Sequence, residues 1–262
     1  DWSSRIHEDP TRTDPSIGDF GGLPMTPQAL AHADTWTESR LTLIERQCVP
    51  NGASWAFRGP AQIRIWEEKD PTTQDVVAIK TFVSTFSQTR TIWMDDRPHP
   101  SEAAPHTWMG FSTGKWEGNI LTVSTTHLKW GWIRRNGLRH TDQATMTEHF
   151  IRHGDFLTIA QIIYDPTYLT EPFVLTTDFQ LDPHLQDAPE LCEVNEETDH
   201  PRGWVPHRLP GTMSDSEDFA KKYGIPVEAA RGGAETMYPS FRKRMAGGAA
   251  SPAPTSTPTA RP

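Results

Sequence analysis

Between residues 60 and 180 the chain alternates polar and apolar residues with a period of two, in runs rich in β-branched and aromatic side chains. Gly, Asn and Asp residues separate many of these runs. The pattern is typical of β-strands that bury one face. The predicted strands and strand pairs are Gln62 to Trp66, Val76 to Ser84, Arg90 to Met94, His106 to Thr113 with Ile120 to Leu128, Ala144 to His153 with Phe156 to Tyr164, and Phe173 to Leu181.

The connections between these segments favour a mainly β fold. Most of them are short turns and no helical crossover intervenes, so sequential strands are expected to be antiparallel neighbours. We therefore predict an antiparallel meander that closes into a lipocalin-like barrel. A β-sandwich is the alternative, and the order of the strands distinguishes the two folds.

Less regular segments flank the strands. Residues 1–25 are predicted to form an extended polar arm, and Thr26 with Pro27 marks the start of a helix that reaches about residue 46. This helix and the strands make one β-rich domain over residues 26–213. Residues 214–245 are predicted to contain a short helix, capped by Ser214 and followed by Gly224. Residues 246–262 are rich in Ala, Gly, Pro, Ser and Thr and are predicted to form a flexible tail.

Composition excludes two classes of partner. The 262 residues carry 34 acidic and 25 basic side chains, a formal net charge of -9, and no Lys/Arg cluster of the kind that binds a nucleic-acid backbone. A transmembrane helix needs about 20 consecutive apolar residues, and no stretch of this sequence approaches that length. A soluble protein without a nucleic-acid partner is expected. Cys48 and Cys192 form one disulfide in an oxidising compartment or remain two thiols, and the sequence leaves both open.

A two-residue turn at Gly118-Asn119 fixes the register of the first predicted hairpin. Ser112 then lies opposite Thr125, Trp116 opposite Leu121 and Gly110 opposite His127. The inner face of this hairpin is predicted to carry Trp108, Gly110, Ser112 and Trp116 with Leu121, Val123, Thr125 and His127.

A turn at Gly154-Asp155 places a carboxylate on an otherwise apolar face of the second hairpin. Glu148 lies opposite Gln161 there, with apolar neighbours two residues away on its own strand. Burying such a group is costly unless it is hydrogen-bonded or neutralised. Glu148 is therefore either a structural residue or a functional acid, base or ligand anchor. The structural hypothesis gives it Gln161 or an arginine as partner, with Arg90, Arg97 and Arg152 as the candidates.

Other motifs carry weaker signals. Gly110 to Gly114 matches the G-x-S-x-G pattern of serine hydrolases, but that pattern needs a helix after the serine and here a strand is expected, which favours a strand serine. His149 and His153 would lie about 13 Å apart along a strand, too far to share an ion. No metal site is predicted, and the alternative is that His99, His106, His127 and His140 converge in space with Asp95 or Asp96. The loop that contains Asp95 and Arg97 follows the end of a predicted strand. Because loops at strand ends surround the mouth of a barrel, these two residues are candidates for contact with a ligand.

The run from Trp108 to Val123 resembles the W-x-G-x-S-x-G-x-W-E-G-[DN]-x-L-x-V signature of a family of uncharacterised bacterial proteins that usually carry export signals. The similarity covers roughly residues 85–200. Members commonly show Asp-Gly-Arg where this chain has Asp95-Asp96-Arg97. The resemblance implies a periplasmic or secreted β-rich protein. It supplies no reaction and no cofactor.

Two hypotheses about function follow. The first is an exported protein whose barrel pocket binds a small, partly apolar or aromatic molecule, with Glu148 and His127 as the acid/base pair if the protein is an enzyme. The ligand contacts predicted for this pocket are Trp108, Ser112, Thr125, Gln161, Asp95 and Arg97. The second hypothesis is a non-catalytic accessory or structural subunit of a larger cell-envelope assembly, with other protein subunits as its partners.

Overall fold

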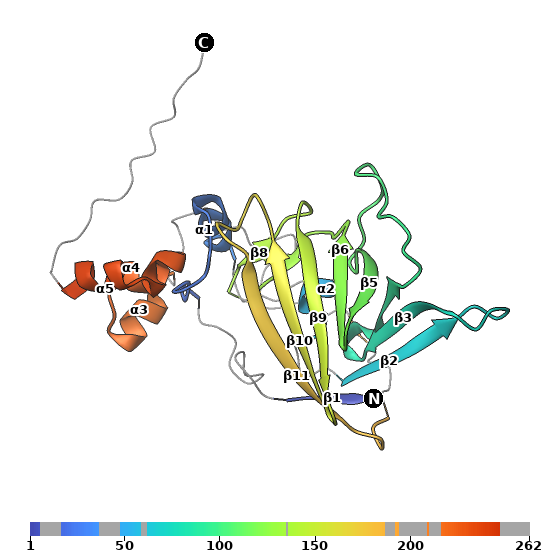
Figure 1. The fold of residues 1–262 in the computed structure, drawn as a ribbon. Helices are drawn as coiled ribbons and strands as arrows, with labels where there is room; N and C mark the ends of the chain where they lie inside the picture. Colours follow the sequence, from blue (N-terminus) through green and yellow to red (C-terminus); the bar gives the residue numbers. More distant parts are fainter. Residues whose placement is uncertain are drawn as a thin grey trace, which may run out of the picture.

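The computed structural model confirms the prediction of a mainly β barrel (Figure 1). It describes residues 1–5, 17–36, 48–58, 62–134, 136–186, 192–193, 209 and 216–246. Within them, nine strands close into a barrel in the order β1-β11-β10-β9-β6-β5-β4-β3-β2. The barrel strands are β1 (Trp2–Ser4), β2 (Gln62–Lys69), β3 (Val76–Val83), β4 (Gln88–Trp93), β5 (Phe111–Glu117), β6 (Ile120–Thr126), β9 (Thr145–His153), β10 (Phe156–Tyr164) and β11 (Phe173–Leu181).

The first residues of the chain belong to the barrel wall, which differs from the extended arm predicted for residues 1–25. Trp2 pairs with Leu181 of β11 on one side and with Ile63 of β2 on the other. A strand of three residues is too short to show alternation, so the pattern of the sequence did not reveal it. This short strand is what closes the sheet.

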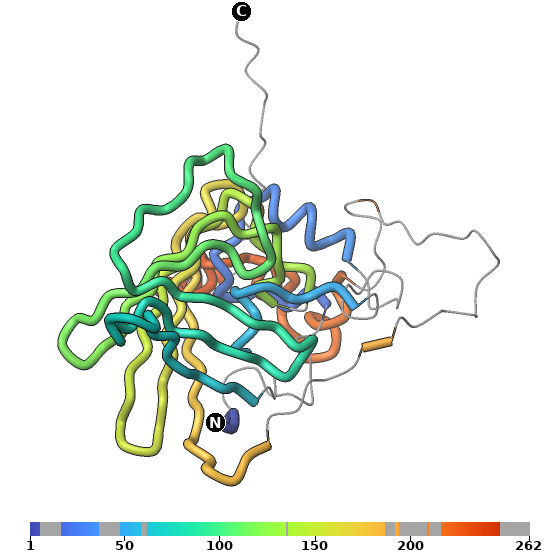
Figure 2. Tube along the Cα trace, turned by 90° about the vertical axis from the view of Figure 1, so that its right-hand side faces the viewer, coloured from blue at the N-terminus to red at the C-terminus, as the bar shows by residue number. Residues whose placement is uncertain are grey.

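One pair of strands is parallel, although an all-antiparallel meander was expected. β4 and β5 pair at Ile92–Ser112 and Trp93–Thr113, and the intervening residues 94–110 form a long loop, green in Figure 2. The strand predicted from His106 therefore begins only at Phe111. The small sheet of β7 (Gly131–Trp132) and β8 (Arg139–His140) lies between β6 and β9 in sequence, and these two barrel strands still pair directly.

The two hairpin registers are confirmed where the strands pair. Ser112 lies opposite Thr125, and Glu148 lies opposite Gln161. The expected pairing of Gly110 with His127 is wrong, because the β5–β6 ladder ends at Phe111 and Thr126. Gly110 and His127 both adopt positive φ, of 65° and 56°, so the alternation of side chains breaks at this end of the hairpin.

A short internal segment fills part of the barrel. Helix α2 (Ala53–Ala56) lies inside the ring of strands (Figure 1), and Phe57, which follows it, is fully buried. The Phe57 ring packs edge-on against Phe150 and Phe179, at centroid distances of 5.9 and 6.4 Å. Aromatic packing of this kind makes residues 53–57 a plug that belongs to the hydrophobic core.

The first helix begins as predicted and is shorter. The Thr26 hydroxyl accepts a hydrogen bond from the Ala29 amide at 3.1 Å, and α1 (Pro27–Ala33) follows with Asp34 as its C-cap. Residues 37–46 of the predicted helix lie outside the described residues.

The C-terminal helices are α3 (Asp218–Tyr223), α4 (Val227–Arg231), the 3₁₀ turn η3 (Gly233–Met237) and α5 (Pro239–Ala246). α3 ends as predicted, at Gly224 with φ 63°. The predicted cap Ser214 and the tail beyond residue 246 lie outside the described residues. These helices contact residues 20–22 and the end of α1. The Phe20 amide donates to the Ala230 carbonyl at 2.8 Å, and Arg231 pairs with Asp34, the C-cap of α1, at 2.6 Å.

Candidate functional site

Four of the predicted site residues meet in one buried cluster around Arg90. The Glu148 carboxylate is completely buried, pairs with the Arg90 guanidinium through Oε2 and accepts a hydrogen bond from Gln161 Nε2 through Oε1 at 3.0 Å. Arg90 also donates from Nε to Ser112 Oγ at 3.1 Å and from Nη2 to Thr125 Oγ1 at 2.7 Å. We call Arg90, Ser112, Thr125, Glu148 and Gln161 the Arg90 cluster.

The hydrogen bonds of the Arg90 cluster are those of a buried structural network. Glu148 and Arg90 neutralise each other, and both carboxylate oxygens are occupied by donors. Removal of either partner would leave the other as an uncompensated buried charge. Because Arg90 is only 3% exposed and Ser112 1% exposed, a substrate has no direct path to these groups. The geometry favours the structural hypothesis for Glu148.

His127 does not join Glu148. Its positive φ of 56° turns the side chain to the loop 94–110, where its Nε2 lies 2.9 Å from the Ser101 carbonyl and its Nδ1 lies 2.7 Å from Thr126 Oγ1. His99 shares this hydroxyl, with Nδ1 2.7 Å from Thr126 Oγ1 and Nε2 2.8 Å from Thr113 Oγ1. The acid/base pair expected from the sequence is therefore not assembled, and His127 helps to fasten the loop.

The hydrogen bonds of the loop join two imidazoles through one hydroxyl. The Ser101 carbonyl only accepts, so Nε2 of His127 carries a proton. Thr126 Oγ1 lies between Nδ1 of His127 and Nδ1 of His99, and Nε2 of His99 lies next to the Thr113 hydroxyl. Burial, and secondarily the coulombic influence of His127, lowers the pKa of His99.

The remaining predicted contacts lie apart from the Arg90 cluster. Trp108 precedes β5, packs edge-on against Trp130 at 5.8 Å and accepts the Ala53 amide on its carbonyl at 3.0 Å. Asp95 and Arg97 pair with each other at 2.8 Å, and the guanidinium lies 3.5 Å above the ring of Trp93. Hydrogen bonds from Arg97 lower the pKa of the Asp95 carboxyl. Asp95 and Arg97 thus neutralise each other within the loop after β4.

The G-x-S-x-G pattern is a packing feature of the barrel. A Cβ on Gly110 would come within 2.6 Å of the Thr126 carbonyl oxygen, and one on Gly114 within 2.6 Å of Met94 Sδ and 2.8 Å of Ile92 Cγ2. Ser112 lies on strand β5 between them and belongs to the Arg90 cluster. Close approach of neighbouring atoms accounts for both glycines.

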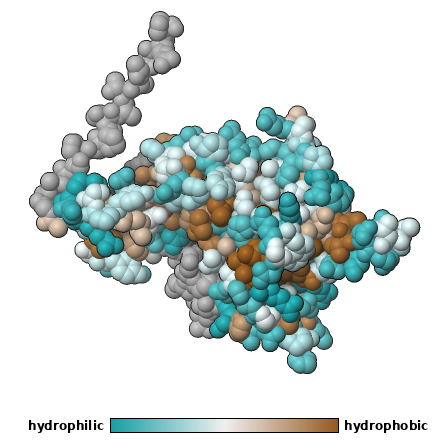
Figure 3. Space-filling model, viewed as in Figure 1, coloured by the Kyte–Doolittle hydropathy of each residue, from teal (hydrophilic) through white to brown (hydrophobic). Residues whose placement is uncertain are grey.

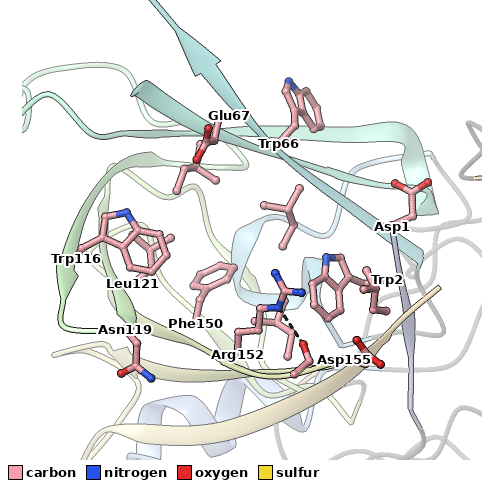
Figure 4. Close-up of a pocket in the computed structure, with 15 residues that line it drawn as sticks. Asp1, Trp2, Trp66, Glu67, Trp116, Asn119, Leu121, Phe150, Arg152 and Asp155 are labelled. Carbon is pink, nitrogen blue, oxygen red and sulfur yellow. Dashed lines mark hydrogen bonds between the residues drawn. The ribbon is translucent and has the colours of Figure 1, made fainter. Parts of the chain in front are cut away.

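An open pocket of about 870 Å³ lies at the end of the barrel where the β5–β6 and β9–β10 hairpins turn (Figure 4). Its walls come from the inner faces of the strands and are mainly apolar. Phe150 lies at the centre of this view, with Trp116 and Trp2 on opposite sides. The lining residues are Asp1, Trp2, Ile65, Trp66, Glu67, Ile79, Trp116, Asn119, Leu121, Phe150, Arg152, Gly154, Asp155, Leu157 and Leu181.

None of the eight site residues predicted from the sequence lines this pocket. The predictions were based on polar residues of the inner face, which lie deeper in the barrel or on the loop 94–110. The alternation itself continues outward from Glu148 through Phe150 to Arg152, and this signal, with Trp116 on the neighbouring hairpin, points to the open end. Trp116 remains 56% exposed, although Leu121, which lies opposite it on β6, is part of the core.

Within the described ranges the structure has neither a metal-binding cluster nor a membrane-spanning helix. No group of three or more His, Cys, Asp or Glu side chains there is arranged to hold a metal ion. The helices of that part of the chain are also all too short or too polar to cross a membrane.

Comparisons of the chain with family models, with curated proteins and with solved structures found no match.

Proposed function

We propose that this barrel binds a small, largely apolar molecule in its open end. The pocket of about 870 Å³ carries this proposal, because its size and its apolar lining with a few polar groups at the rim are those of small-molecule sites. Exposed Trp116 supports it further, since a large aromatic side chain that lines a cavity offers a stacking or apolar contact to a ligand.

Binding has more support than catalysis. An acid or base must reach its substrate, and Glu148 is enclosed with both oxygens occupied. His127 is bound to the loop and lies outside the Arg90 cluster. The open end of the barrel, in contrast, presents an apolar surface at which core side chains such as Leu121 and Phe150 line an accessible pocket.

The test uses Nile red, a neutral dye whose fluorescence rises in apolar surroundings. Wild-type protein is expected to bind it with a micromolar dissociation constant, as about 8 kcal/mol of binding free energy is within reach of a mainly apolar pocket of this size. Ile65→Trp, on the inner face of β2, fills the pocket and should abolish the signal. Val174→Trp, on the exposed face of β11, is the matched control and should leave it unchanged. Equal binding by both variants would refute the proposal.

We also propose that the protein is exported and belongs to the family whose signature it resembles. The bond between Cys48 and Cys192 supports this, since structural disulfides form mainly in oxidising compartments. Fractionation of the native cells tests the proposal: recovery of the protein in the cytosol with both thiols reduced would contradict it.

A further inference from the structure

Arg152 places an exposed cation at the open end of the apolar pocket, without a carboxylate partner among the described residues. It lies on the inner face of β9, two residues beyond Phe150, and its side chain extends into the pocket between Phe150 and Trp2 (Figure 4). Its Nε donates to the Gly154 carbonyl at 2.9 Å, and its guanidinium carbon lies 5.5 Å from the ring centroid of Trp2. Among the described residues, no carboxylate lies within ion-pairing distance of the guanidinium.

We propose that the ligand is an anionic amphiphile, an apolar chain or ring system with one anionic group, and that Arg152 binds this group. The inference rests on the proposed function and adds the chemical class of the ligand. The hydrogen bond to Gly154 fixes Nε and leaves the two terminal nitrogens to donate, which suits a carboxylate or a similar oxyanion.

The acidic side chains of the rim do not compete for this role. Asp1 is paired with Arg64 at 2.9 Å, and Glu67 lies 3.4 Å from Lys69. Asp155 is exposed at the tip of the β9–β10 hairpin and lies away from the centre of the pocket in Figure 4. Arg152 is therefore the charged side chain that lies next to Phe150 at the centre of the pocket in Figure 4.

The position of Arg152 also orients the ligand. Arg152 lies next to the turn of its hairpin, whereas Phe150, Leu121 and Ile79 line the pocket deeper in the barrel and are buried. An apolar chain that is held at its anionic end by Arg152 would point toward these three side chains. Burial of the chain supplies most of the affinity and the charge supplies the selectivity.

Three ligands with the same ten-carbon chain test the inference: decanoate, decanol and decyltrimethylammonium, each titrated against bound Nile red at low ionic strength. Wild-type protein should bind decanoate about tenfold more tightly than decanol, as expected for one partly solvated charge-assisted contact, and should bind the ammonium ligand most weakly. Arg152→Gln should remove this preference and keep the affinity for decanol.

Lys115→Gln is the matched control. Lys115 is exposed on the outer face of β5 at the same end of the barrel, so this change removes an equal charge outside the pocket and should keep the preference. Arg152→Glu should reverse the preference toward the ammonium ligand, which a loss of folding would not produce.

The outcomes separate this inference from the proposed function. If Nile red binds and wild-type protein does not prefer decanoate, or if Arg152→Gln keeps the preference, the anionic assignment is overturned and the pocket stands. If Nile red does not bind, the proposed function fails as well.

Discussion

The ion pair of Glu148 with Arg90 gives this carboxylate a structural role that a substitution can test. Glu148→Gln keeps the shape of the side chain and removes the charge that faces Arg90. Because the guanidinium would then be buried without a counter-charge, we expect the free energy of unfolding to fall by about 3–5 kcal/mol. Urea denaturation measures this loss.

Glu117→Gln is the control for Glu148→Gln, because Glu117 is an exposed carboxylate whose replacement should change stability by less than about 0.5 kcal/mol. Binding of Nile red should survive in both variants, since neither residue lines the pocket. Unchanged stability of Glu148→Gln together with a loss of binding would restore a functional role for this carboxylate.

Three histidines predict a loss of stability in mild acid. Burial is the main cause that lowers the pKa of His32, to about 4, and the pKa values of His99 and His140. The unfolded chain takes up these protons near pH 6.5 and the folded chain resists them. The stabilisation by His32 is therefore complete above about pH 6.5 and is lost as the pH falls toward about 4, and His99 and His140 act in the same direction. The melting temperature should drop across this window.

A single substitution isolates the contribution of His32. His32→Gln removes one titrating group with a lowered pKa. The melting temperature of this variant should therefore fall less with pH between about 6.5 and 4 than that of the wild-type protein. His184→Gln, at an exposed position, should keep the wild-type slope. A wild-type melting temperature that stays constant from pH 7 to pH 4.5 would contradict the expected linkage.

At the scale of elements, the contact between β4 and β5 depends on Gly114. These parallel strands pair at only two positions, and an added methyl group would press on Ile92, which is fully buried. Gly114→Ala should therefore lower the free energy of unfolding by about 1–3 kcal/mol, as overpacking of a core does.

The hairpin glycine Gly118 offers the comparison for Gly114→Ala. A Cβ at Gly118 would meet no atom within 4 Å, and its φ of 65° is one that Asn tolerates. Gly118→Asn should thus cost less than Gly114→Ala in chemical denaturation. The packing explanation would fail if the two variants lost the same stability.

The elements differ in how far the sequence could predict them. Strands β9 and β10 alternate over nine residues each and meet at a Gly-Asp turn, so both their bounds and their register followed from local pattern. The parallel β4–β5 pair depends on the long loop 94–110, and the closing strand β1 on three residues. Contacts between segments far apart in sequence decide both, and no local pattern encodes them.

The same distinction holds for the candidate site. The sequence placed Glu148, Gln161, Ser112 and Thr125 on inner faces, and the barrel brings all four together with Arg90. Their burial could not be predicted, because it depends on the plug at residues 53–57, a segment without strand or helix periodicity. The plug lies beside the polar residues, where the Ala53 carbonyl accepts a hydrogen bond from Gln161, and the pocket lies at the end of the barrel where the hairpins turn.

At the scale of the whole molecule, the bond between Cys48 and Cys192 confirms the disulfide alternative and closes a loop of 144 residues that contains every barrel strand except β1. In the chain-entropy model, such a loop destabilises the unfolded state by about 5 kcal/mol. The double variant Cys48→Ser with Cys192→Ser should therefore unfold at lower urea concentration than the oxidised protein, and reduced wild-type protein should match it. Neither cysteine lines the pocket, so the folded variant should bind Nile red with wild-type affinity. Equal stability of the oxidised protein and the double variant would show that the loop is already constrained in the unfolded chain, whereas lost binding would mean that the disulfide shapes the open end of the barrel.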